Sequence, residues 1–585
     1  MRENDPFDKV LIMPSGKALD AEPRDNTKTR AKSARALVSE LPRDELRRDP
    51  APKTLQSGSR TLFDLRRKGR QYRLQDAYRS VRNLEFRSRE QFIEQRFQEY
   101  VLQRKKGQLF RDELIVSVET RPGAPAGEEY LAVWTERRFP RGKMMVMVDA
   151  TVYPQVKDSV AQYVLDVARD GYWATIHVIT GGKPGPIRDY IRSQSVVGVV
   201  MVGAVAAPWF DLGGDQFPCD LFYMDSDGRW TDPDGDGKYT THDGNVHPEL
   251  WIGRICTPTQ GGNDATLIND YFRRNHLFRL GQLGHGYGAL AFVDDDWQGF
   301  GSCALDSVFP TASITTYTNP TATDADLYKA EVNSQRSFVQ LCAHSWPQGH
   351  AFSVDSAREY IDASYFRDLN PPNAHFYNLF CCGPGRYTEP DYLAGWYIFD
   401  RNTTGKHHGL AAIASAKTGS MLFFEDFYEP MGNGPNGTNA VIGDAFVQWW
   451  QALGPDHDDG ERSWHYGLVL LGDPTLSWWK GAVPTPRQPE NGDRFDHWPR
   501  KMQLRWDPVQ IPGVTYSVEV DAWGASRSGQ WAEESGAPGW ITHNFTDTTM
   551  SHEFVGAQPG RWRVRAHVNG VACAWSPWSY FSYSV

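Results

Sequence analysis

The chain contains the uninterrupted apolar run Met144-Met145-Val146-Met147-Val148. A strand of this composition is buried on both faces, which is typical of a parallel sheet covered by helices. Apolar residues at helical spacing follow over 156–167, and a second strand-like run, 174–179, comes after Gly171. The sequence therefore predicts a strand–helix–strand unit at this point.

The same pattern recurs through the middle of the chain. A short helical stretch over 187–191 leads to the apolar run 196–203, and further buried strands are predicted at 289–293, 337–341, 376–380 and 410–414. Strands that alternate with helices favour an α/β fold with a parallel sheet and right-handed crossovers. The number of predicted strands fits either one long sheet or two.

The last hundred residues have a different pattern. Short alternating strands are predicted at 502–506, 515–520 and 562–566, with turn residues between them and no helical period. We expect an all-β sandwich of the immunoglobulin type, preceded by a Pro-rich linker over 483–489. The strand sequences, followed by Trp575-Ser576-Pro577-Trp578-Ser579, resemble a fibronectin type III domain.

Composition limits the class of protein. The 585 residues are 40% hydrophobic and 23% charged, which excludes a wholly disordered or fibrous chain. No run of about 18 apolar residues is present, so we expect no membrane span. Seven cysteines without a CxxC pair indicate neither a disulfide framework nor a zinc site.

Charge is divided unevenly along the chain. Residues 1–110 contain 26 Lys+Arg and 16 Asp+Glu, and the remainder contains 36 and 56. The basic arm has no recognisable nucleic-acid motif, so we expect no nucleic-acid partner. It is either a solvated tail or a segment that docks on the acidic body, and helical spacing over 70–106 indicates an apolar face that needs a partner.

Two predicted strands end in residues that can carry chemistry. Cys381 and Cys382 follow 376–380 and precede Gly383, while His344 follows 337–341. The C-terminal ends of parallel strands meet at one edge of a sheet, where α/β proteins place their active groups. If the strands are neighbours, the imidazole reaches the thiol and a Cys–His dyad results. Buried structural cysteines remain the alternative at this stage.

An acidic loop has the spacing of a calcium site. Positions 1, 3, 5 and 12 of an EF-hand-type loop are occupied by Asp232, Asp234, Asp236 and Asp243. Glycine stands at position 6 and Lys238 at position 7. Oxygen ligands at this spacing converge on one hard cation, so we expect structural calcium. An acidic surface loop without a cation is the alternative.

Several motifs in order resemble the gingipain family of caspase-like cysteine peptidases. His344 and, about 40 residues later, a strand-end cysteine match the family's dyad. The other matches are Tyr153-Pro154, Gly171-Tyr172, Ile187-Arg188, 200–203, 219–223, 248–255 and 471–476. The resemblance covers about 140–480 and implies a caspase-like α/β/α core in two subdomains.

The resemblance also implies roles for individual residues. Cys382 corresponds to the nucleophile, with Cys381 as the alternative, and His344 to the general acid and base. Asp296, one of three adjacent aspartates, corresponds to a carboxylate that orients the histidine. The amides of Gly383 and Cys382 are the natural oxyanion donors. Asp306 lies near the position that lines the pocket of Arg-specific members, which implies cleavage after Arg or Lys.

The sequence thus predicts four regions. They are a basic arm over 1–110 that is a candidate pro-segment, an α/β subdomain with the calcium loop over 111–280, a catalytic subdomain over 281–482, and a sandwich over 486–585. We expect a cysteine endopeptidase that can process itself. An inactive relative that binds through its sandwich, and a transpeptidase with the same dyad, remain alternatives. The opening residues do not resemble a signal peptide, whereas calcium and the sandwich favour the cell envelope or exterior.

Overall fold

The computed structural model describes residues 115–117 and 141–583, with gaps at 285, 355–356, 403–406, 433–437, 439, 455–456, 480–481, 491, 510, 512, 524–539, 555–558, 569–570 and 577. The predicted arm over 1–110, its helix and its docking on the core lie outside the described residues. The chain forms two compact units. One comprises the residues up to Arg273 together with Gly288–Leu476, and the other comprises Arg274–Tyr287 with Ser477–Val585.

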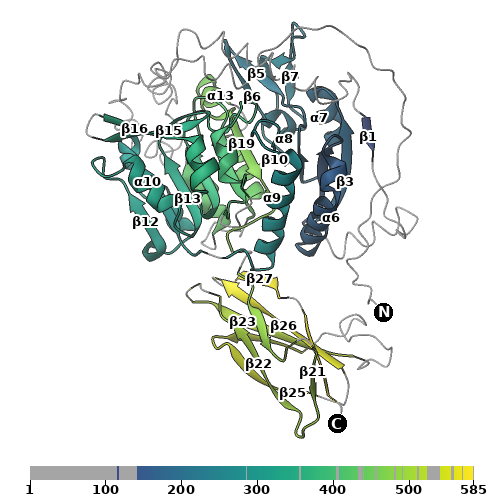
Figure 1. Cartoon of the computed structure of the whole chain (residues 1–585). Coiled ribbons are helices and arrows are strands. Elements are labelled where there is room, and N and C mark those ends of the chain that lie inside the picture. Colours follow the sequence, from purple (N-terminus) through teal and green to yellow (C-terminus); the bar gives the residue numbers. More distant parts are fainter. Residues whose placement is uncertain are drawn as a thin grey trace. The chain divides into compact units, whose positions relative to one another are not determined.

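One sheet of eleven strands organises the first unit (Figure 1). In spatial order its strands are β1 (Ile115–Ser117), β3 (Trp173–Thr180), β2 (Lys143–Asp149), β4 (Gly198–Val202), β10 (Trp251–Ile255), β19 (Leu468–Gly472), β18 (Ala411–Ser415), β17 (Ala374–Phe380), β13 (Arg336–Cys342), β11 (Ala289–Val293) and β12 (Ile314–Tyr317). Of the two arrangements open from the sequence, the single long sheet is therefore observed, and it joins strands from both predicted α/β subdomains. The coarse prediction of a mixed α/β fold is confirmed.

Apart from the edge strand β1, which is antiparallel to β3, the sheet consists of two parallel halves that run in opposite directions. Strands β3, β2, β4, β10 and β19 are parallel to one another, and so are β18, β17, β13, β11 and β12. The halves meet where β18 and β19 pair in antiparallel fashion. Each half begins with its first strand in the interior, its second strand on one side and its third on the other. Each half therefore has one point where the winding direction switches.

Helices connect these strands. Figure 1 shows the α-helices α6 (Tyr153–Arg169), α7 (Pro184–Ser193), α8 (Leu221–Met224), α9 (Asp264–Arg279), α10 (Ala325–Val332) and α13 (Asp459–His465), and the unit also contains α11 (Phe424–Tyr428) and α12 (Ile442–Ala452). Helix α6 starts with proline in its first turn and buries Val156, Val160 and Val164. That apolar face packs against β2 and β3, as its spacing predicted.

Two smaller groups of strands lie in the connections of the sheet. The segment between β4 and β10 carries β5 (Trp209–Leu212), β6 (Asp215–Pro218), β7 (Arg229–Thr231), β8 (Lys238–Tyr239) and β9 (Thr241–Asp243). We call residues 205–250 the insertion. The connection from β13 to β17 carries β14 (His344–Trp346), β15 (Gly349–Val354), β16 (Ala357–Asp362) and the π-helix η4 (Tyr365–Leu369). Short 3₁₀ turns complete the unit: η1 (Asp295–Phe300), η2 (Leu305–Ser307), η3 (Thr311–Ser313), η5 (Leu393–Tyr397) and η6 (Glu429–Met431).

Among the described residues, the Ser477–Val585 part of the second unit contains strands and no helix, and it is sandwich-like. One sheet has the order β20 (Thr485–Gln488), β22 (Lys501–Asp507), β25 (Thr549–Glu553), and the other contains β21 (Asp493–Phe495), β28 (Ser579–Tyr583), β26 (Pro559–Val568), β23 (Thr515–Ala522), β24 (Trp540–Phe545) and β27 (Val571–Trp575). The prediction of a linker over 483–489 is wrong for Thr485–Gln488, because these residues form β20, which pairs with β22. Proline is tolerated there because β20 is an edge strand.

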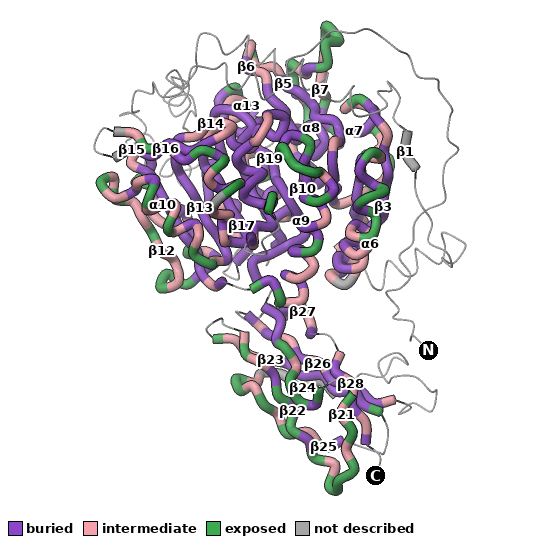
Figure 2. Tube along the Cα trace, viewed as in Figure 1, coloured by how far each residue is buried: buried purple, intermediate pink, exposed green. Residues whose placement is uncertain are grey.

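Burial follows the predicted pattern. The central strands of the large sheet are buried along their length, and exposed residues lie mainly at the rims of the α/β unit (Figure 2). Met144–Met147 are each 0% exposed, as expected for a strand covered on both faces. No helix among the described residues is both long enough and apolar enough to cross a bilayer.

Candidate functional site

Three neighbouring strands place the candidate residues at one edge of the sheet. Val293 of β11 pairs with Cys342 of β13, and Cys342 pairs with Phe380 of β17. His344 and Cys382 each follow this matched row by two residues. The switch point of this half lies between β11 and β13, where ligands bind in open α/β sheets.

Asp296 and His344 are in direct contact across the switch point. Asp296 is the second residue of the 3₁₀ turn after β11 and accepts a hydrogen bond of 2.5 Å on Oδ2 from His344 Nε2. Both residues are 3% exposed, and the Trp297 ring lies 4.6 Å from the imidazole, centroid to centroid. An imidazole that donates from Nε2 keeps Nδ1 as its basic nitrogen. The contact matches the orienting role predicted for Asp296.

The three adjacent aspartates have different environments. Asp294 turns into the protein and accepts from the backbone N–H of Ser353 at 3.1 Å. Burial, with the neighbouring Asp295 carboxylate, raises the pKa of Asp294 to about 8. Burial also raises the pKa of Asp295. Asp296 contacts the imidazole directly, whereas Asp294 accepts from the backbone of Ser353.

The two candidate cysteines differ in accessibility. Cys382 is partly exposed, whereas the other six cysteines of the chain are buried. Burial raises the pKa of the Cys381 thiol, which disfavours its thiolate. A thiolate is the reactive form of cysteine, so the accessible Cys382 is the better nucleophile of the pair.

The turn after Cys382 is held by backbone hydrogen bonds. The N–H of Gly383 donates to the carbonyl of Lys417 at 2.9 Å, and that of Gly385 donates to Ser415 at 2.9 Å. Gly383 has φ +83°, a conformation that favours glycine. Its amide is engaged within the fold, so the geometry does not support the predicted role of Gly383 as an oxyanion donor.

Buried charges hold the far end of this turn. Tyr387 donates to Asp220 Oδ1 at 3.0 Å, and Asp220 accepts two hydrogen bonds from Arg254, at 2.6 and 2.7 Å. The Arg254 guanidinium also lies 4.4 Å from the centroid of the Tyr387 ring. Three separate sequence motifs of the predicted resemblance therefore meet at one place.

The predicted specificity residue lies in a different setting. Asp306 is exposed on η2 and accepts from Ser302 Oγ at 3.2 Å. This contact does not join it to His344 or Cys382. Cleavage after Arg or Lys therefore stays a prediction.

The acidic loop brings together part of the predicted ligand set. Asp232, Asp234 and Asp236 each offer a carboxylate oxygen, and these oxygens lie within 4.8 Å of one another. Asp243 belongs to β9 and forms an ion pair with Arg229 of β7 at 3.7 Å, so it stands outside this group. Lys238 Nζ lies 3.2 Å from Asp236 Oδ2. The loop thus gathers three of the four predicted carboxylates, and their chemistry suits a hard cation.

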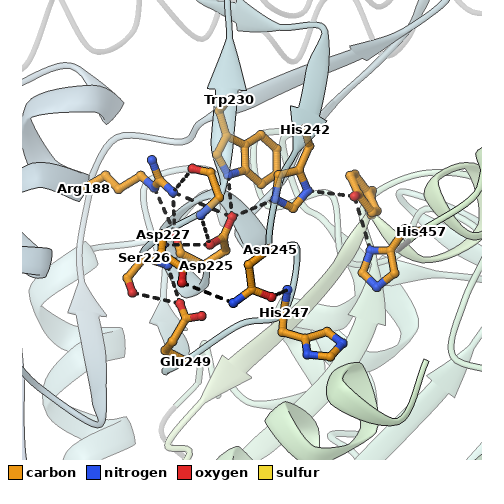
Figure 3. A network of polar contacts seen from close by, with 12 residues as sticks. Arg188, Asp225, Ser226, Asp227, Trp230, His242, Asn245, His247, Glu249 and His457 are labelled. Carbon is orange, nitrogen blue, oxygen red and sulfur yellow. Dashed lines mark hydrogen bonds and ion pairs between the residues drawn. The ribbon is translucent and has the colours of Figure 1, made fainter. Parts of the chain in front are cut away.

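A buried polar network joins the hairpin of this loop to the core (Figure 3). Asp225 lies 2.7 Å from His242 Nε2, and the other ring nitrogen of His242 lies 2.7 Å from the Tyr466 hydroxyl. Trp230 stacks on the imidazole at 3.8 Å and donates to Asp225 at 2.9 Å. Burial lowers the pKa of His242, and the pKa of Asp225 is also lowered because hydrogen bonds from His242 and Gly228 outweigh its burial. The pair is therefore neutral imidazole and carboxylate at neutral pH.

Sequence reasoning missed the polar residues behind the turn. Lys417 is 1% exposed and pairs with Asp215 of the insertion at 2.9 Å. One signal was present, because Lys417 follows a buried strand at the same edge as His344 and Cys382. A charged residue in that position has a role in the site or in its support.

The comparisons with known proteins are limited. No protein-family model matches the chain, and no curated protein matches it. Among solved structures, an Fn3-like protein from Clostridium thermocellum is 20% identical, covering 18% of this chain and 91% of that one at a TM-score of 0.13. A fibronectin type III domain derived from human KIAA0970 protein is 14% identical, covering 18% and 77% at 0.13. These similarities are weak, and the sandwich-like unit is defined here by its own strand pairing.

Proposed function

We propose that the chain is a cysteine endopeptidase with Cys382 as nucleophile, His344 as general acid and base, and Asp296 as the residue that orients the imidazole. The observation that carries the proposal is the Asp296–His344 hydrogen bond at the switch point, next to the one partly exposed cysteine on the matching level of the adjacent strand. An accessible thiol, a base and an orienting carboxylate are the parts that acyl transfer requires.

The proposed reaction has two steps. The Cys382 thiolate attacks the carbonyl carbon of the scissile peptide, and the protonated imidazole of His344 delivers its proton to the leaving amine. This forms a thioester and releases the first product. In the second step His344 removes a proton from water, the hydroxide attacks the thioester, and the thiolate is regenerated. Asp296 keeps the imidazole in the required tautomer throughout.

The test is cleavage of a mixed peptide pool by wild type, Cys382→Ala and His344→Ala. Cleavage by the wild type and its loss in both variants is expected. Equal behaviour of all three proteins would contradict the proposal and favour an inactive binding protein. The residue before each cut tests the Arg/Lys preference implied by Asp306, and an added amine that appears in the products indicates transpeptidation.

We also propose structural calcium at Asp232, Asp234 and Asp236. A ligand that binds only the folded protein stabilises it by about 2.7 kcal/mol when the free ligand concentration is about 100 times the dissociation constant. Calcium should therefore raise the melting temperature of the wild type, and Asp234→Asn/Asp236→Asn should abolish the shift. An unchanged shift in the variant would place the cation elsewhere.

A further inference from the structure

The nucleophile turn, residues 382–386, rests on the bend that follows β18. Three consecutive carbonyls of this bend accept hydrogen bonds from the turn. Ser415 accepts from Gly385 N at 2.9 Å and Lys417 accepts from Gly383 N at 2.9 Å. Ala416 accepts from the Arg386 guanidinium at 3.2 Å. The path of the turn is therefore set by where residues 415–417 lie.

The side chain of Lys417 fastens this bend to two other parts of the unit. Its Nζ donates to the carbonyl of Thr418 at 2.7 Å and to the carbonyl of Ser463, in α13, at 2.6 Å. It also lies 2.9 Å from Asp215 Oδ2, in β6 of the insertion. Two carbonyl oxygens therefore accept hydrogen bonds from the ammonium group, and the Asp215 carboxylate balances its charge.

The ion pair between Lys417 and Asp215 is buried, which costs desolvation free energy. Lys417 is 1% exposed and Asp215 is 9% exposed. Charges are costly to bury, and well-packed apolar residues of similar volume often serve stability equally well. An ion pair retained here therefore points to a requirement for geometry in addition to stability.

We propose that Lys417 is a positioning residue for Cys382. The proposal rests on the proposed role of Cys382 as the reactive thiol. Lys417 holds the bend against α13 and the insertion, and the carbonyls of the bend hold the turn that carries Cys382. Displacement by about 1 Å of a group in such a site can cost about a hundredfold in rate.

The reactivity of the thiol tests this role without a substrate. A nearby imidazolium raises the thiolate fraction of Cys382, so the pH profile of its alkylation by iodoacetamide reports on the Cys382–His344 geometry. Peptide mapping measures the extent of alkylation at Cys382. Lys417→Met should slow alkylation at neutral pH at least tenfold and move the midpoint of the profile to higher pH.

A second variant separates positioning from stability. Lys417→Met leaves Asp215 buried without its cation, whereas Lys417→Met/Asp215→Leu removes both charges and should regain the wild-type melting temperature. We expect alkylation by the double variant to stay slow and its midpoint to stay shifted, because the bend has lost its ties to Thr418 and Ser463. Recovery of rate, midpoint and melting temperature together would overturn the proposal, since Lys417 would then be structural only.

The control is Lys143→Met. Lys143 is a partly buried lysine in the other half of the sheet, and its Nζ donates to the carbonyl of Gln194 at 3.3 Å. Its alkylation profile should match the wild type. Peptide cleavage is measured separately. If the wild type cleaves no peptide but Lys417→Met still slows the alkylation of Cys382, the proposed function is contradicted and the positioning role remains supported.

Discussion

The two halves of the large sheet wind in the same way but carry different residues at their switch points. In the first half Asp149 ends β2, and the neighbouring β4 is followed by Gly203 and Ala204. In the second half the aspartates follow β11, and the neighbouring β13 is followed by His344. Asp149 accepts from Thr151 and from Ala204 N–H, at 2.9 and 3.3 Å, whereas Asp296 accepts from an imidazole. The topology provides two equivalent positions, and the proposed catalytic side chains occur at only the second of them.

The largest difference is expected at the second switch point. Asp296→Asn keeps the shape of the side chain but removes the charge that orients His344, so kcat/KM for peptide cleavage should fall about a hundredfold. The melting temperature should change little by comparison. Steady-state kinetics alongside thermal unfolding measure the two effects. Full activity in the variant would remove Asp296 from the proposed mechanism.

The second effect distinguishes Asp294 from Asp296. The folded-state pKa of Asp294 is about 8, against about 3.9 for an ordinary aspartate. The folded protein therefore holds an extra proton between these values, and its stability falls as pH rises from about 4 to 8. Asp294→Asn cannot ionise, so its stability relative to wild type should increase by about 1.4 kcal/mol for each pH unit within that window.

Calorimetry of the α/β unit at pH 5 and pH 8 measures this. A stability difference between variant and wild type that stays constant over that range would show that Asp294 titrates normally.

The smallest effect is expected at the first switch point. Asp149→Ala leaves the Ala204 amide and the Thr151 hydroxyl without their acceptor and should cost about 1–3 kcal/mol of stability. The alkylation profile of Cys382 should stay within about twofold of wild type, because Asp149 belongs to the other half. A large change in that profile would mean that the two halves are coupled.

The sequence predicts strands in both halves where apolar residues form a short run, but β10, β12 and β19 are not among the predicted strands. Strands β2, β3, β11 and β17 lie within one or two residues of their predicted bounds. The direction of β19 was beyond prediction, because an antiparallel partner of β18 has the same apolar pattern as a parallel one. Strand β20 was missed because its proline is typical of a linker and also of an edge strand.

The site is predicted in its residue types but not in its contacts. His344 and Cys382 stand out because each lies two residues after the end of a buried strand. Which of three adjacent aspartates faces His344 depends on the 3₁₀ turn after β11, which local sequence does not specify. The Gly383 amide and the Lys417 carbonyl are 34 positions apart, so their hydrogen bond arises from tertiary packing. Asp243 fits the calcium spacing, but its position in the β7–β9 hairpin directs it to Arg229.

The most direct test of the account is capture of the acyl-enzyme. Wild-type protein is mixed with a peptide pool, quenched in acid within the first turnover, and mapped by mass spectrometry. We expect a peptide acyl group on Cys382 in the wild type and no such group in His344→Ala. An acyl group on another residue, or peptide cleavage that persists in Cys382→Ala, would contradict it.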